Sequence, residues 1–196
     1  MNAPPLRVST KQALHGNKMT SEVAVHEAGH VLVGLKTGRK LLRVWVRGGE
    51  GCVEFEPFRW FPGGVARIRR GLTVDVAGFL AEDLAAGCNR DRLSRRLAGG
   101  YSGPVHLDDR AAVRKAWAIR TGELLDDYHT QHVFWQQAGH GRHEDILAEV
   151  VRAERRAERI LKRQWVAFLK LAHALSRRPC GRMDIAQVRK LVGRLS

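Results

Sequence analysis

The chain is poor in cysteine and has no long apolar run. Its three cysteines lie far apart in a sequence of 196 residues and form no C-x-x-C pair. This argues against a disulfide scaffold and a cysteine-rich zinc site, and it indicates reduced thiols. No apolar run approaches the roughly 20 residues of a membrane-spanning helix, and the N-terminal segment lacks the apolar centre of a signal peptide. We therefore expect a cytoplasmic protein without a membrane anchor.

Acidic residues are also scarce relative to basic ones. Asp and Glu number 20 against 34 Lys and Arg, which gives a formal net charge of +14. A nucleic acid, an anionic surface or an acidic substrate would suit such a charge. No nucleic-acid-binding motif accompanies it, so solvated arginine-rich helix faces explain it more simply. The excess is greatest over residues 151–196, with thirteen basic residues against three acidic ones.

The apolar pattern predicts one mainly α (α+β) domain over residues 20–196, after a loose arm over residues 1–19. Apolar residues alternate on both sides of a glycine-rich turn between Leu42 and Phe55, which is typical of a β-hairpin. A loop is expected over residues 57–70, where prolines and glycines gather. Helices are expected from Thr20 or Ser21 to about Gly38, over 72–86, from 108 onward, over 144–176 and over 184–195.

The most informative stretch is His26-Glu27-Ala28-Gly29-His30, an H-E-x-x-H pattern inside an apolar segment. Residues four apart on a helix share nearly the same face, so His26 and His30 can offer imidazole nitrogens to one Zn²⁺. Glu27 lies beside that face, where a carboxylate can take a proton from a water molecule that the metal activates. The alternative is a pair of core histidines satisfied by hydrogen bonds, because buried polar groups need partners.

A catalytic zinc usually has three protein ligands and leaves a fourth position open. The third ligand must come from elsewhere in the chain, and the residues alone leave several acidic and histidine side chains as candidates. They are Glu82, His106, Asp108, Asp109, His129, His132, His140 and His143.

Several segments, taken in order, resemble the peptidase domain of the FtsH-type proteases, which are membrane-anchored AAA+ zinc proteases. VAVHEAGHVLVG resembles the opening helix of that domain, and RVWVRGGEGCVEFEP resembles its strand, glycine turn and strand. VDVAGFLAEDLAAG, SGPVHLDDRAAVRKAWAI and the closing helices are similar to its later segments. The resemblance spans roughly residues 20–193. No glycine-rich P-loop accompanies it, so we expect the protease part without an ATPase module.

The resemblance implies a zincin-like helical peptidase domain with a small sheet beside the HEAGH helix. It makes His26 and His30 ligands of Zn²⁺ and makes Glu27 the catalytic base. Glu82 corresponds to a glutamate of the family that would orient a ligand or a helix.

The third ligand implied by the resemblance is an aspartate that opens a helix. Ala112 and Ala116 follow Asp108 at the spacing of the family, and Ser102 precedes it at the matching distance. Asp108 is therefore the expected ligand, and Asp109 is the alternative.

The implied function is a zinc-dependent, ATP-independent endopeptidase that cuts unfolded or flexible protein segments. The hairpin edge and the aromatic segment 58–61 would hold an extended substrate, and a separate unfoldase could deliver folded proteins. The alternative function is a non-catalytic, basic, zinc-containing protein that binds nucleic acid or a protein partner. Its basis is the arginine-rich C-terminal helices, expected over about residues 144–196.

Overall fold

The computed structural model describes residues 21–57, 64–88, 92–98, 107–122, 142–177 and 182–193. These residues form mainly helices with one three-stranded antiparallel sheet, as the sequence predicts. The expected arm over residues 1–19 and the aromatic segment 58–61 lie outside the described residues. None of the described helices is long and apolar enough to cross a membrane.

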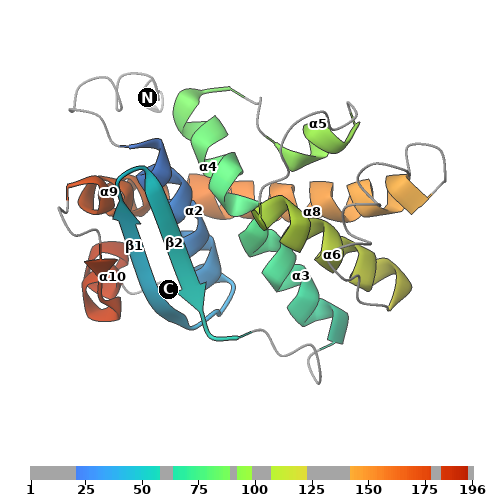
Figure 1. Cartoon of the computed structure of the whole chain (residues 1–196), viewed down its shortest axis with the longest axis horizontal. Helices are drawn as coiled ribbons and strands as arrows, with labels where there is room; N and C mark the ends of the chain where they lie inside the picture. Colours follow the sequence, from blue (N-terminus) through green and yellow to red (C-terminus); the bar gives the residue numbers. More distant parts are fainter. Residues whose placement is uncertain are drawn as a thin grey trace, which may run out of the picture.

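The central element is α2 (Glu22–Lys36), which carries the HEAGH stretch. Ser21 caps it, since its hydroxyl accepts a hydrogen bond from the Ala24 backbone N–H, as expected for this residue type. The helix is apolar nearly all round, so it is buried along most of its length. It packs against the hairpin, α4 (Ala77–Ala86) and α9 (Trp165–Ser176) (Figure 1).

The sheet confirms the predicted hairpin and adds a short third strand. β1 (Leu41–Arg47) pairs with β2 (Glu50–Phe55) on one side and with β3 (Arg182–Met183) on the other. The tight turn between β1 and β2 uses Gly48 and Gly49, both with positive φ. Because the strand order is β2-β1-β3, one edge of β2 pairs with no other described strand.

The remaining helices form a layer beside α2. In Figure 1, α3 (Gly64–Asp75) and α6 (Leu107–Thr121) lie in front of the long α8 (Arg142–Arg163). The short α5 (Leu93–Ala98) also packs on α8. The last helix, α10 (Ile185–Val192), lies within the helix expected over 184–195 and begins with a capping box formed by Asp184 and Gln187.

Three expectations about helix boundaries are wrong. The loop predicted over residues 57–70 gives way to α3 at Gly64. The helix predicted over residues 72–86 is two helices that meet at Val76, and the long helical pattern over 144–176 is broken at Gln164. Prolines and glycines suggested a loop in the first case. In the other two cases the apolar residues keep a helical period across the break, so the pattern alone does not show where one helix ends and the next begins.

Candidate metal centre

The metal centre is built first from two turns of α2. His26 and His30 are four residues apart and point the same way, with ring centroids 4.7 Å apart. The side chain of His30 is 8% exposed and that of His26 is 14% exposed. Their Nε2 atoms face each other at 3.0 Å, so both rings present the same nitrogen to one point.

The first turn of α6 brings Asp108 to that same point. Its Oδ2 lies 3.1 Å from Nε2 of His26 and 3.3 Å from Nε2 of His30. All three side chains therefore offer ligand atoms within 4.8 Å of one another, an arrangement that could hold a metal ion. Within the described part of the chain, this is the one such group of histidine, cysteine and acidic residues.

Hydrogen bonds on the far side of each ring fix where the protons are. His26 Nδ1 lies 2.7 Å from a carboxylate oxygen of Glu82, and His30 Nδ1 lies 2.8 Å from the Val74 carbonyl oxygen. Both partners accept hydrogen bonds, so each Nδ1 carries a hydrogen and each Nε2 of a neutral ring carries a lone pair. When both rings are neutral, two lone pairs and a carboxylate oxygen thus converge without a donor among them. Such a set fits a cation, and the three atoms would be its ligands.

The pKa values of the three side chains also show that this site favours positive charge. Burial by itself lowers the pKa of His26, but hydrogen bonds and charges from Asp108 and Glu82 raise this pKa to about 10. His30 behaves alike: burial opposes protonation, yet Asp108 raises its pKa. Burial would raise the pKa of Asp108, but both histidines lower it well below its usual range. The metal-free centre therefore holds protons where a metal ion would replace them.

Glu27 lies beside the centre and is 7% exposed. Burial raises the pKa of its carboxyl, and the positive charges of His30 and His26 oppose this rise. The backbone of β2 passes over it at Gly51, where a Cβ would lie 2.6 Å from Glu27 Oε1. A proton-accepting carboxylate is thus held between the histidine pair and the outer strand of the hairpin.

Two glycines let the helices approach closely enough to form the centre. A Cβ on Gly29 would lie 2.7 Å from the Ala77 carbonyl oxygen and 2.7 Å from Ala81 Cβ, so α2 and α4 can cross closely only with glycine there. A Cβ on Gly78 would overlap the ring of His26 and lie 2.6 Å from His30 Nε2. Gly78 therefore leaves open the space in front of the ligand atoms.

The alternative ligand, Asp109, lies away from the centre. It is 2% exposed, and both of its carboxylate oxygens accept hydrogen bonds from Arg96, at 2.6 and 2.7 Å. The Arg96 guanidinium also lies over the ring of Phe79, 4.7 Å from its centroid. Phe79 in turn meets the ring of His26 edge to face at 4.8 Å. Asp109 thus contacts the centre indirectly, through a cation and an aromatic ring.

The structure brings together His26, His30 and Asp108, with Glu27 and Glu82 beside them. Sequence reasoning missed the Val74 carbonyl and Arg96, and it identified Gly78 only as a position of close helix packing, not as part of the site. Of these three, only Gly78 could be noticed in the sequence, because it is a small residue inside an apolar helix. The other candidate ligands fall outside what the structure describes, because residues 106, 129, 132 and 140 and the side chain of His143 are not among the described parts.

Comparison with known proteins does not assign the chain to a family. No protein-family model matches the chain, and no curated protein matches it.

Proposed function

We propose that the protein is a zinc-dependent, ATP-independent endopeptidase with a zincin-like fold, similar to the peptidase domain of FtsH-type proteases. The observation that carries the proposal is the convergence of His26, His30 and Asp108 beside the buried carboxylate of Glu27. A purely structural metal site has no need for such a base. Unfolded or flexible protein segments are the proposed substrates, because cutting folded ones would require a separate unfoldase.

Zinc is the proposed metal on the chemistry of the donors. Zn²⁺ binds imidazole nitrogen and carboxylate oxygen at about 2.0–2.2 Å, so two ligands of a tetrahedral ion lie roughly 3.3 Å apart. The three candidate ligand atoms lie 3.0, 3.1 and 3.3 Å from one another. The hydrogen bonds from each Nδ1 to Glu82 and Val74 are the orienting contacts that metal-binding histidines usually make.

When bound, zinc supplies a Lewis acid that polarises the peptide carbonyl and acidifies water. The Glu27 carboxylate takes a proton from the attacking water and later donates it to the leaving nitrogen. Burial supports this role, because it raises the affinity of the Glu27 carboxylate for a proton. His26, His30 and Asp108 would hold the metal ion, and Glu82 keeps the His26 ring in the tautomer that ligation would require.

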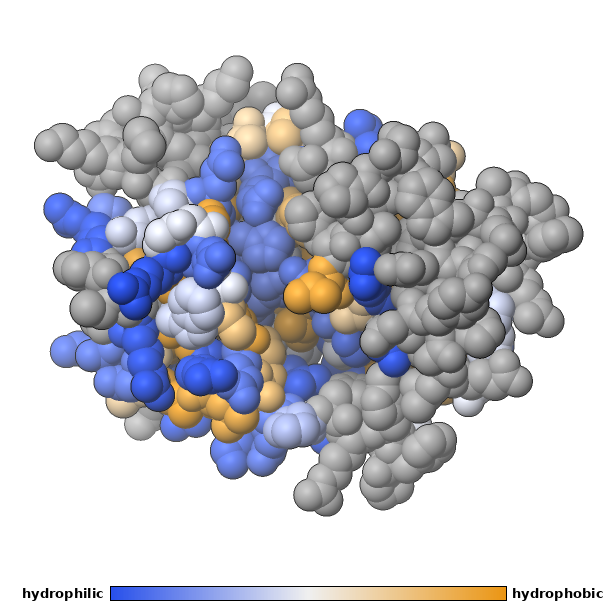
Figure 2. Space-filling model, in the orientation of Figure 1, coloured by the Kyte–Doolittle hydropathy of each residue, from blue (hydrophilic) through white to orange (hydrophobic). Residues whose placement is uncertain are grey.

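The outer strand of the hairpin is the proposed substrate support. β2 ends the sheet, and its Gly51 lies against Glu27. An extended segment that pairs with the open edge of β2 would run past the catalytic base. The face that carries the hairpin and α4 is mostly hydrophilic, with smaller apolar areas (Figure 2), which suits backbone pairing with many substrate sequences. A cytoplasmic location is part of the proposal and agrees with the free thiols of Cys52 and Cys88.

The test is the substitution Glu27→Gln, with Glu22→Gln on the exposed first turn of the same helix as the matched control. We expect Glu27→Gln to keep its zinc and to lose cleavage of unfolded casein by about 10²-fold or more. The control should cleave like the wild type. Equal cleavage by the two variants would remove Glu27 from the mechanism. Zinc-loaded wild type that cleaves no substrate would favour the alternative, a non-catalytic binding protein.

A further inference from the structure

Helix α8 separates its charges between its two sides. Beyond the exposed Glu144 and Asp145 of its first turn, its acidic side chains are Glu149, Glu154 and Glu158. Glu149 and Glu154 are 1% and 3% exposed and accept hydrogen bonds from other elements, and the side chain of Glu158 is 20% exposed. Its basic side chains are exposed along the opposite side. We call this exposed row the α8 ridge: Arg152, Arg155, Arg156, Arg159, Lys162 and Arg163.

The ridge brings like charges together. Its members are three or four residues apart, so neighbours on the helix surface repel one another and destabilise the helix. Arg152 pairs with Glu149 at 2.5 Å, and Lys162 pairs with Glu158 at 2.7 Å. The other four ridge arginines form no ion pair with any described residue. A helix face that only needs to be solvated would mix both signs. The negative end of the helix dipole explains cations in the last turn, but not those in the middle.

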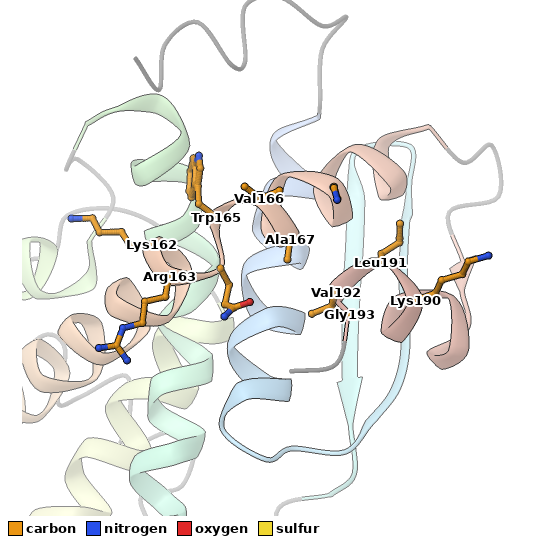
Figure 3. Close-up of a pocket in the computed structure, with 11 residues that line it drawn as sticks. Lys162, Arg163, Trp165, Val166, Ala167, Lys190, Leu191, Val192 and Gly193 are labelled. Carbon is orange, nitrogen blue, oxygen red and sulfur yellow. The ribbon is translucent and has the colours of Figure 1, made fainter. Parts of the chain in front are cut away.

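The ridge continues into a pocket at the C-terminal end of α8. The pocket has a volume of about 480 Å³ and lies between the junction of α8 with α9 and the end of α10. Lys162, Arg163, Lys170 and Lys190 line it together with Trp165, and none of the described residues that line it is acidic. Figure 3 shows Lys162 and Arg163 extending on one side of the pocket and Lys190 on the other. A predominantly positive surface thus extends from α8 to Lys170 of α9 and Lys190 of α10.

The density of positive charge indicates the kind of partner. The ridge places six cations, two of them paired with carboxylates, along the 12 residues from 152 to 163, an axial span of about 16 Å. Duplex DNA carries one negative charge per about 1.7 Å of axis. An extended acidic peptide turns only every second side chain toward one surface, so its charges lie roughly 6.6 Å apart. Five of the six cations are arginines, whose planar forks suit phosphate oxygens.

From these observations we infer that the α8 ridge and its pocket bind the phosphate backbone of duplex DNA. Binding is independent of base sequence, because the ridge offers cations for phosphate oxygens, and phosphate contacts carry no direct sequence information. The inference does not depend on the proposed peptidase activity, since it uses none of the residues of the metal centre. Removing like charges from the ridge should also leave the helix at least as stable as before.

The test measures binding of a fluorescein-labelled duplex by anisotropy between about 50 and 200 mM salt. The ridge variant is Arg155→Gln, Arg159→Gln and Arg163→Gln combined. The control variant combines Lys40→Gln, Arg47→Gln and Arg70→Gln, which are exposed residues on other elements. Both variants lose three positive charges. Thermal unfolding of both, followed by circular dichroism, checks that they are folded.

We expect the ridge variant to lose about tenfold or more in affinity, and its plot of log K against log salt to be shallower by about 2 to 3. The control should keep the slope of the wild type. An unchanged slope in the ridge variant, or equal losses in both variants, would overturn the assignment of the ridge. Tighter binding to a single strand or to polyglutamate than to the duplex would overturn the choice of partner. Casein cleavage should be equal in all three proteins, which separates this result from the peptidase test.

Discussion

At the scale of single residues, the metal centre depends on a side chain that is missing. Gly78 of α4 faces the two histidines, and even a methyl group there would overlap the ring of His26. Glu82 and the Val74 carbonyl hold both rings by hydrogen bonds, so the rings cannot easily turn aside. The methyl group would therefore press on both rings and crowd the point at which their Nε2 atoms converge.

We predict that Gly78→Ala lowers zinc affinity by about 10²-fold or more while the metal-free protein stays folded. The reason is steric, because all three ligand residues remain. Competition with a fluorescent zinc chelator measures the affinity. Gly29→Ala is the contrasting variant, since its methyl group would meet the Ala77 carbonyl and Ala81 rather than the ligands. It should lower the free energy of unfolding by about 1–3 kcal/mol by overpacking. If Gly78→Ala binds zinc like the wild type, the space assigned to the ion is wrong.

At the scale of elements, local signals predicted some parts of the fold well. Ser21 and Asp184 mark helix starts because their side chains accept hydrogen bonds from nearby backbone N–H groups. Gly48 and Gly49 mark the hairpin turn because they adopt positive φ. These devices act within a few residues, so the sequence reveals them.

Other features depend on distant partners and could not be predicted locally. The break at Val76 separates α3, whose Val74 carbonyl meets His30, from α4, whose Glu82 meets His26. A continuous apolar pattern conceals this bend. Residue type alone also left open the choice between Asp108 and Asp109. In the structure Asp109 pairs with Arg96, thirteen residues away in the sequence, and Asp108 faces the two histidines.

The Asp109–Arg96 pair ties α5 to the start of α6, the turn that carries Asp108. Both carboxylate oxygens of Asp109 are engaged and the residue is buried. A bidentate pair of this kind fixes direction as well as distance. The pair therefore positions Asp108, although neither member contacts the ligand atoms.

We predict that Arg96→Gln lowers zinc affinity by about 10-fold to 100-fold without removing a ligand. The matched control is Arg95→Gln, which removes the neighbouring exposed arginine and should change little. Arg96→Lys keeps the charge but cannot make the two parallel hydrogen bonds of a guanidinium. Its zinc affinity should therefore lie between those of Arg96→Gln and the wild type. The chelator competition described above measures all three variants. Equal zinc affinity in Arg96→Gln and the wild type would reduce the pair to a packing contact.

At the scale of the whole molecule, several acidic side chains are buried and many basic side chains are exposed. Buried carboxylates hold helices together: Glu149 accepts from Arg69, and Asp75 accepts from Lys115 at 2.5 Å. Much of the excess positive charge then stays at the surface, where it repels itself. Basic residues thus have two separate uses, internal pairing and an exposed surface, and only the second contributes to the net charge of +14.

The metal ion would act as a link across the whole fold, because its ligands lie 78 and 82 residues apart along the chain. A ligand that binds only the folded state stabilises it by about 2.7 kcal/mol at a free concentration 100 times its Kd. We therefore predict that zinc raises the free energy of unfolding by about this amount in the wild type. Glu27→Gln should show the same increase, and His30→Ala should show almost none. Denaturant unfolding with buffered zinc measures it.

This stabilisation should grow with pH, and the sign follows from His26. Its pKa in the metal-free fold is raised to about 10, against about 6.5 in an unfolded chain. Bound protons therefore stabilise the metal-free fold fully below about pH 6.5, and this contribution is lost as the pH rises toward 10. Zinc needs the unprotonated rings, so its advantage over the metal-free state widens across the same range. A zinc-induced increase that stays constant between about pH 6.5 and 9 would show that protons and metal do not compete for these three side chains.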